Sequence, residues 1–109
     1  MVGFPIGVLY ADDLNDALNY MFTNQMYDEL VLYLEACESG SMFENILSTD
    51  INIYATTASN GELSSYAAYC YPFDKVNGIH VGSCLGDLYS VTWMEDTDVN
   101  DIKLETLTT

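Results

Sequence analysis

The sequence predicts an α/β fold in which two parallel strands share one sheet, and two patterns support this prediction. Residues 30–34 form a continuous apolar run, LVLYL, that stops at acidic and small polar residues, as is typical of a strand buried on both faces. Residues 51–58 alternate in the manner of a second strand. Because the connection between them is long enough for a right-handed crossover, we expect the two strands to be parallel.

The residues before the first of these strands predict an extended segment and then a helix. Residues 2–10 are apolar with a proline and a glycine between them, which indicates a short hairpin or an irregular extended segment. Asp12 or Asp13 is expected to cap a helix that ends at residues 24–25. Its buried face is expected to consist of the apolar residues at helical spacing: Leu14, Ala17, Leu18 and Met21.

Between the two strands, residues 41–44 (SMFE) match a capping box, which predicts a helix over residues 42–47. Residues 58–61 predict a turn at the carboxyl end of the second strand. This turn would place residues 60–65 on the same rim of the sheet as the end of the first strand. Residues 66–83 contain a proline and two glycines that interrupt any period, so we expect an irregular loop.

The last third of the chain is less regular. Residues 88–94 fit both the alternation of a strand and one face of a helix, so the residues alone leave this segment open. Residues 95–98 (EDTD) are expected to cap a final helix that begins near residues 99–102.

Composition excludes several classes of function. A chain of 109 residues forms one domain at most, and its hydrophobic content of 50% is enough for a core. The formal net charge is −15 and only Lys75 and Lys103 are basic, which argues against binding to nucleic acid or to anionic membranes. No apolar run approaches the ~20 residues of a membrane span, and we expect no signal peptide ahead of the globular pattern. The three cysteines and one histidine do not fall at zinc spacings, so no metal site and no cofactor are expected.

Cys37 is the candidate for chemistry, because it follows a buried strand at the edge where open α/β sheets bind ligands. A helix that starts within one turn of the thiol would favour the thiolate, whereas Glu35 and Glu38 would raise the pKa of the thiol. The alternative is a small buried structural cysteine, which the residues alone favour, since free cysteine is among the most buried residue types.

Four blocks of the sequence, in order, resemble the legumain family of asparaginyl endopeptidases, also called vacuolar processing enzymes. The blocks are residues 35–42 (EACESGSM), 54–58 (YATTA), 62–66 (ELSSY) and 85–96 (LGDLYSVTWMED), and the similarity runs from about Phe4 to Leu107. The resemblance implies a caspase-like three-layer sandwich with a mostly parallel sheet, of which residues 1–109 would be an incomplete fragment. It also implies that residues 88–94 are helical.

In that family a cysteine thiolate attacks the carbonyl after an asparagine, and a histidine transfers the proton. Cys37 matches the nucleophile, and Glu35, Ser65 and Asp87 match the pocket that binds the asparagine carboxamide. An amide offers two donors to carboxylates that can only accept, whereas an aspartate is repelled until it is protonated. The resemblance therefore implies an endopeptidase that cleaves protein or peptide substrates after asparagine, and after aspartate in acid.

Each pocket residue also has a simpler explanation. Glu35 fits a solvated charge at a strand end, Ser65 a turn hydroxyl, and Asp87 a helix cap. The histidine of the family belongs to a His-Gly motif on a strand that we expect to precede the region matched here. His80 has no counterpart in the family and fits a solvated loop residue better than a catalytic base.

Cys70 and Cys84 bracket the irregular loop, and the resemblance to plant members of the family implies a disulfide between them. Closing a loop of about 15 residues would stabilise the fold by ~3 kcal/mol in the chain-entropy model. It would leave Cys37 as the odd thiol in an oxidising compartment, as expected for a lysosomal, vacuolar or secreted protein. The alternative is three unpaired cysteines in a cytosolic protein.

Three functions remain open from the sequence. The first is a legumain-type endopeptidase, the second is a peptide ligase that uses the same site, and the third is a non-catalytic interaction module of the caspase-like fold. We expect the catalytic histidine and the flanking strands of the sheet to lie outside these 109 residues. The 109-residue chain alone is therefore expected to be poorly stable and inactive.

Overall fold

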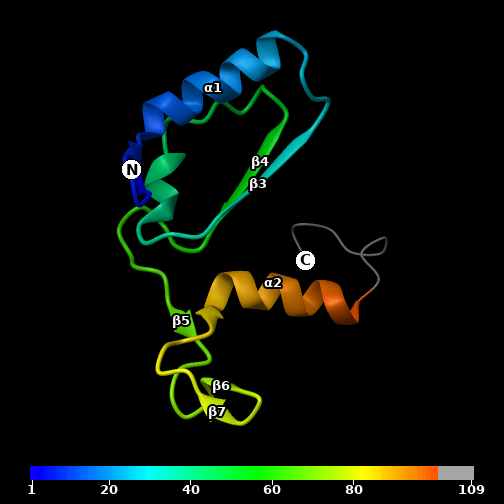
Figure 1. Ribbon diagram of the computed structural model, residues 1–109. Helices are drawn as coiled ribbons and strands as arrows, with labels where there is room; N and C mark the ends of the chain where they lie inside the picture. The colour runs from blue at the N-terminus through cyan, green and yellow to red at the C-terminus, as the bar shows by residue number, and fades with distance from the viewer. Residues whose placement is uncertain (101–109) are drawn as a thin grey trace. The chain divides into compact units, whose positions relative to one another are not determined.

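The computed structural model describes residues 1–100. The chain divides into two compact units, Met1–Ser65 and Tyr66–Thr109, of which the second is described as far as residue 100 (Figure 1). Each unit is described below by itself.

The first unit begins with the predicted hairpin, formed by the antiparallel strands β1 (Val2–Gly3) and β2 (Val8–Leu9). Helix α1 (Ala11–Thr23) follows, and Asn24 is its C-cap, in agreement with the predicted end of the helix at residues 24–25. The predicted cap was wrong, because Tyr10 occupies the N-cap and Asp12 and Asp13 lie in the first turn. Carboxylates in the first turn still stabilise the helix, since they face the positive end of its dipole.

The central feature of this unit is the parallel pair of strands β3 (Leu30–Leu34) and β4 (Ile53–Thr57), which confirms the predicted topology. Leu32 lies opposite Ala55 in the register. The strand β3 is not buried on both faces, since Val31 is 40% exposed and Tyr33 is 44% exposed. Its leucines alternate with these residues and are half-buried, so the described residues cover one face of the strand much better than the other.

A small core supports this pair of strands. Leu18 on α1, Met42 and Ile51 are each at most 5% exposed and come from three segments of the first unit. Tyr27, which follows α1, donates a hydrogen bond from its hydroxyl to the Ile51 carbonyl oxygen at 2.6 Å. Leu14 and Met21 are half-buried, as predicted, whereas Ala17 is exposed. The predicted buried face of α1 is thus confirmed at three of its four positions.

The segment after Cys37 differs from the prediction. It is a 3-10 helix, η1 (Ser39–Met42), followed by turns over residues 43–46, and no α-helix spans residues 42–47. The Glu44 carboxylate accepts a hydrogen bond from the Gly61 N–H at 3.0 Å, and the Ser41 N–H donates to the Glu38 carbonyl oxygen at 3.0 Å. The acidic residue of the predicted capping box therefore forms a tertiary contact. The helical backbone is interrupted at Asn45, whose φ is +58°.

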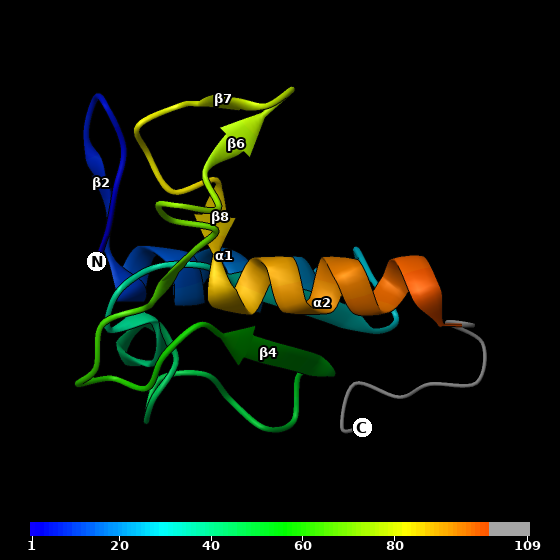
Figure 2. The ribbon, with the colours of Figure 1, turned by 90° about the horizontal axis from the view of Figure 1, so that it is seen from below.

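The second unit contains two antiparallel strand pairs and one helix. Strand β5 (Ala67–Ala68) pairs with β8 (Gly86–Asp87), and β6 (Lys75–Val76) pairs with β7 (Ile79–His80). Helix α2 (Leu88–Val99) follows β8 directly and confirms the helical prediction for residues 88–94. The β6–β7 hairpin projects beyond the β5–β8 pair in both views (Figures 1 and 2).

Two predictions for this unit need correction. The loop predicted to be irregular contains the β6–β7 hairpin, whose turn residues Asn77 and Gly78 both have positive φ, 51° and 81°. An Asn-Gly pair supplies this backbone conformation readily. Residues 95–98 lie inside α2 and cap no further helix, and the helix predicted to begin near residues 99–102 falls largely outside the described residues. Within residues 1–100, no helix combines the length and the apolar character that crossing a bilayer requires.

Candidate active site

Cys37 lies three residues beyond the end of β3, at the edge of the sheet where both parallel strands terminate. Its thiol is free and exposed, so the alternative of a buried structural cysteine is wrong. The next residue, Glu38, has a positive φ of 49°, and this left-handed conformation makes the chain turn sharply directly after the cysteine. The turn leaves the side chain of Cys37 at the rim of the sheet.

The sulfur of Cys37 lies 3.6 Å from the hydroxyl oxygen of Ser65, which is within hydrogen-bonding range for sulfur. The pKa of the thiol is lowered from its ordinary value, chiefly by the side-chain hydrogen bond with Ser65, with further contributions from the Ser65 backbone N–H and the Ser64 side chain. Partial desolvation and the negative charge of Glu38 raise the pKa and oppose this effect. The sequence predicted that Glu38 raises the pKa of the thiol. It did not indicate the serine hydrogen bonds, which are the main cause of the lowered pKa.

The segment that carries these serines, residues 60–65, is joined to the cysteine turn by a backbone hydrogen bond and is held in shape by the side chain of Asn60. The Glu38 N–H donates to the Leu63 carbonyl oxygen at 2.8 Å. The Asn60 side-chain oxygen accepts hydrogen bonds from the N–H groups of Glu62 and Leu63, at 3.0 and 2.8 Å. Residues 60–65 therefore lie on the same rim as Cys37, which confirms that part of the prediction.

The two predicted carboxylates of the pocket lie in different units. Glu35 is half-buried and follows the last residue of β3, two positions before Cys37. Asp87 belongs to the second unit, where it ends β8 and occupies the N-cap of α2 without a side-chain capping hydrogen bond. The structure thus brings Cys37 and Ser65 together, and the pocket roles of Glu35, Ser65 and Asp87 stay predictions.

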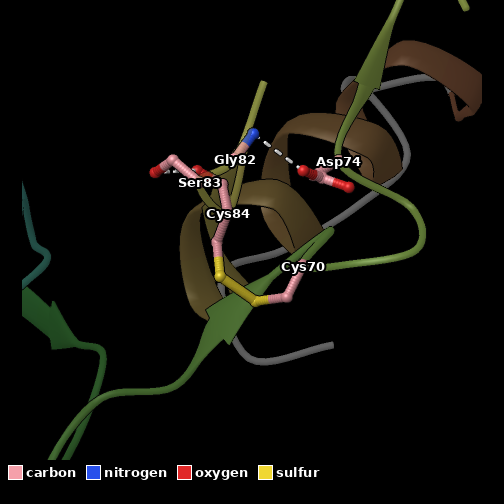
Figure 3. Close-up of a disulfide and its surroundings, with 5 residues drawn as sticks. All are labelled: Cys70, Asp74, Gly82, Ser83 and Cys84. Carbon is pink, nitrogen blue, oxygen red and sulfur yellow. Dashed lines mark hydrogen bonds between the residues drawn. A yellow bond between two sulfur atoms is a disulfide. The ribbon is translucent and has the colours of Figure 1, made fainter. Parts of the chain in front are cut away.

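The sequence predicted that His80 is a solvated loop residue; its side chain is exposed, but it lies on β7 and is hydrogen-bonded. Its Nδ1 lies 2.6 Å from the carboxylate of Asp74, and its side chain is 40% exposed. Asp74 itself is 1% exposed and also accepts a hydrogen bond from the Gly82 N–H at 2.9 Å (Figure 3). The hydrogen bond with His80 is the largest cause that lowers the pKa of Asp74, while burial opposes it. Sequence reasoning missed Asp74, although Lys75 and His80 form a register pair around the Asn-Gly turn.

The expected disulfide between Cys70 and Cys84 is present, with an S–S distance of 2.01 Å (Figure 3). It closes the segment that contains the β6–β7 hairpin and leaves Cys37 as the free thiol. Within residues 1–100, no three His, Cys, Asp or Glu side chains form a group that could hold a metal ion.

Comparison with known proteins identifies the family of the chain. A model of the Peptidase C13 family matches residues 1–109, which is the whole chain. The chain belongs to the Peptidase C13 family. It is 52% identical to a vacuolar-processing enzyme of Vicia sativa over 109 aligned positions, which cover 98% of the chain. It is also 52% identical to legumain of Mus musculus over 104 positions, which cover 95% of the chain.

These matches confirm the predicted resemblance to legumains and vacuolar processing enzymes. A vacuolar-processing enzyme of Citrus sinensis is 48% identical over 108 positions. The matched region makes up 22% of each of these three relatives, so the chain spans about a fifth of the length of the Peptidase C13 proteins that it resembles.

Proposed function

We propose that this chain forms part of a cysteine endopeptidase of the legumain type, with Cys37 as the nucleophile. The observation that carries the proposal is the exposed Cys37 thiol, whose sulfur lies 3.6 Å from the Ser65 hydroxyl and whose pKa is lowered by this contact. The thiolate is the nucleophilic form of cysteine, so a lower pKa increases the reactive fraction at a given pH. Membership of the Peptidase C13 family supports the same chemistry.

In the proposed reaction, the Cys37 thiolate attacks the carbonyl carbon of the scissile peptide bond. A C–S bond forms, the C–N bond breaks, the amine leaves with a proton, and water then hydrolyses the acyl-enzyme. The backbone N–H of Cys37 is a candidate donor to the oxyanion. The single histidine of the sequence, His80, lies in the second unit and is hydrogen-bonded to Asp74. We therefore do not propose it as the group that gives the leaving amine its proton.

For substrate choice, we propose that Glu35, Ser65 and Asp87 bind the carboxamide of an asparagine that precedes the scissile bond. Ionised carboxylates accept hydrogen bonds from the amide NH2 group and repel an aspartate side chain. Protonation of the substrate aspartate in acid removes this repulsion. Cleavage after asparagine should therefore exceed cleavage after aspartate near neutral pH, and the difference should narrow as the pH falls.

The proposed context is protein processing in the vacuole or lysosome, and the name of the relative from Vicia sativa, a vacuolar-processing enzyme, agrees with the vacuole. The Cys70–Cys84 disulfide supports an oxidising compartment. We further propose that residues 1–109 are part of a caspase-like three-layer sandwich, since a parallel β3–β4 pair suits a larger sheet and its exposed face suits a further layer packed on it. In such a domain, further elements would cover Val31 and Tyr33.

A chimera tests the proposed function. The chain replaces the matching segment of legumain from Mus musculus, with which it shares 52% identity, and turnover of an Ala-Ala-Asn reporter is measured. We expect turnover by the chimera and none by its Cys37→Ser variant, and none by the isolated 109-residue chain. We expect Glu35→Gln to weaken the preference for asparagine over aspartate reporters near neutral pH, because it removes one charge that repels the aspartate.

The matched control is Ser41→Ala, which alters an exposed serine four residues from the nucleophile and should keep the activity of the chimera. A correctly folded chimera without turnover would contradict the proposal. Turnover that survives Cys37→Ser would contradict the assignment of the nucleophile.

A further inference from the structure

The hydroxyl of Ser59 contacts the backbone on both sides of Cys37. It donates a hydrogen bond to the carbonyl oxygen of Ala36 at 3.3 Å and accepts one from the N–H of Ser39 at 3.1 Å. Ala36 directly precedes the cysteine and Ser39 follows it by two residues. One half-buried side chain at the end of β4 therefore spans the whole turn that presents the nucleophile.

The proton count of this contact is consistent. A serine hydroxyl has one proton to donate and two lone pairs that accept. If Ser59 donates to Ala36, then Ser39 donates, either to the Ser59 hydroxyl at 3.2 Å or to its carbonyl oxygen at 3.3 Å. The Ser59 N–H donates in turn to the Ser39 hydroxyl at 3.1 Å. Each hydroxyl thus acts once as donor, and Ser39 is only 1% exposed, so these bonds are shielded from water.

The need for this support follows from the turn itself. Cys37 and Glu38 are exposed, Glu38 has a positive φ, and neither belongs to a strand or helix. Beyond Ser59, the turn is held by the hydrogen bond from the Glu38 N–H to Leu63 and by the one from the Ser41 N–H to Glu38. Neither of these bonds contacts the residue before Cys37. The Ser59 hydroxyl does so through the Ala36 carbonyl.

We propose that Ser59 is a positioning residue for Cys37: its hydroxyl ties Ala36 to Ser39 and so holds the sulfur beside Ser65. The inference rests on the proposed role of Cys37 as nucleophile. Without the hydroxyl, the turn loses its tie at Ala36, although the backbone bonds of Glu38 and Ser59 remain, and the sulfur can move away from its serine donors. The thiol then behaves more like an ordinary cysteine.

The pH dependence of Cys37 alkylation by iodoacetamide tests this role on the 109-residue chain. Cys37 is the free thiol, so intact mass reports its modification directly. Ser59→Thr keeps the hydroxyl, and Ser59→Val has the shape of threonine but lacks the hydroxyl. Both variants are compared with wild type. At pH values below the midpoint of the rate–pH profile, we expect Ser59→Val to react roughly threefold to tenfold more slowly than Ser59→Thr. This factor corresponds to the net free energy of one hydrogen bond. The midpoint of Ser59→Val should lie at higher pH, whereas the Thr variant should resemble wild type.

The control is Ser41→Ala, since this exposed side chain forms no hydrogen bond with the other described residues. Circular dichroism checks that each variant is folded. Suppose that wild type reacts with a midpoint below the ordinary thiol value, and that Ser59→Thr and Ser59→Val give the same dependence of alkylation rate on pH. This result would overturn the role of Ser59 and leave the proposed function standing. A wild-type midpoint at the ordinary thiol value would overturn both proposals. Unfolding of Ser59→Val while Ser59→Thr stays folded would also overturn the local role, because the hydroxyl would then support the whole unit.

Discussion

Replacing Gly40 by alanine is expected to destabilise the first unit, because the backbone of residues 60–61 passes directly over this glycine. An added Cβ would lie 2.7 Å from the Asn60 carbonyl carbon and 2.8 Å from the Gly61 nitrogen. Both are main-chain atoms, so opening the shorter contact from 2.7 Å to an ordinary 3.4 Å requires a backbone shift of about 0.7 Å. The hydrogen bond from the Gly40 N–H to the Ser59 carbonyl oxygen, now 2.9 Å, would lengthen as well. Overpacking of this kind costs about 1–3 kcal/mol.

Urea unfolding followed by far-UV circular dichroism measures this cost. With a slope of about 1–3 kcal/mol per molar urea, a loss of about 2 kcal/mol lowers the midpoint by about 1 M. Gly3→Ala is the control, since a Cβ there would meet no atom within 4 Å, and its midpoint should stay at the wild-type value. If Gly40→Ala and Gly3→Ala unfold at the same urea concentration, the close approach at Gly40 does not constrain the fold.

Three further predictions concern the thiol and the disulfide-closed loop. Ser65→Ala should raise the pKa of Cys37, so that the alkylation profile moves to higher pH; an unchanged profile would exclude the Ser65 contact as its cause. The pKa of Asp74 is lowered in the fold, so its stabilisation is complete above the unfolded value of about 3.9 and is lost as the pH falls through the lower folded value. The protection factor of the residue 82 amide, which is its exchange rate relative to an unstructured amide at the same pH, should therefore fall in acid. In Asp74→Asn this protection should already be small at neutral pH and should change little in acid; protection equal to wild type would contradict this. Replacing Cys70 and Cys84 by serine should cost the second unit ~3 kcal/mol, read from its unfolding midpoint, and a neutral result would contradict the loop-closure argument.

The sequence predicted the elements whose pattern is local and strong. The apolar run of β3 and the alternation of β4 identified two strands, and the handedness of their connection gave the parallel pairing. This topology also placed the Ser65 segment on the rim beside Cys37, as the structure confirms. The helix predicted after Cys37 was wrong: Asn45 has a positive φ, which interrupts the helical backbone, and the capping-box glutamate, Glu44, forms a tertiary hydrogen bond with Gly61.

Other features depend on contacts between residues distant in the sequence, and local patterns do not encode them. Ser59 lies about twenty residues from its partners Ala36 and Ser39, and nothing in its own neighbourhood indicates that it spans the cysteine turn. The β6–β7 hairpin is different, since the Asn77-Gly78 pair is a strong local turn signal that the prediction of an irregular loop did not use. The Asp74–His80 pair then follows from the register of that hairpin.

The tip of the β6–β7 hairpin offers a place to add sequence to this protein. Asn77 and Gly78 are exposed, and the paired strands before and after them are exposed as well. The base of the hairpin is held by the buried Asp74, which accepts a hydrogen bond from the Gly82 N–H, and by the Cys70–Cys84 disulfide. Neither contact involves the residues at the tip. Loop tips of this kind tolerate insertions, so an epitope or a short fluorescent tag grafted between Asn77 and Gly78 should leave the rest of the molecule intact.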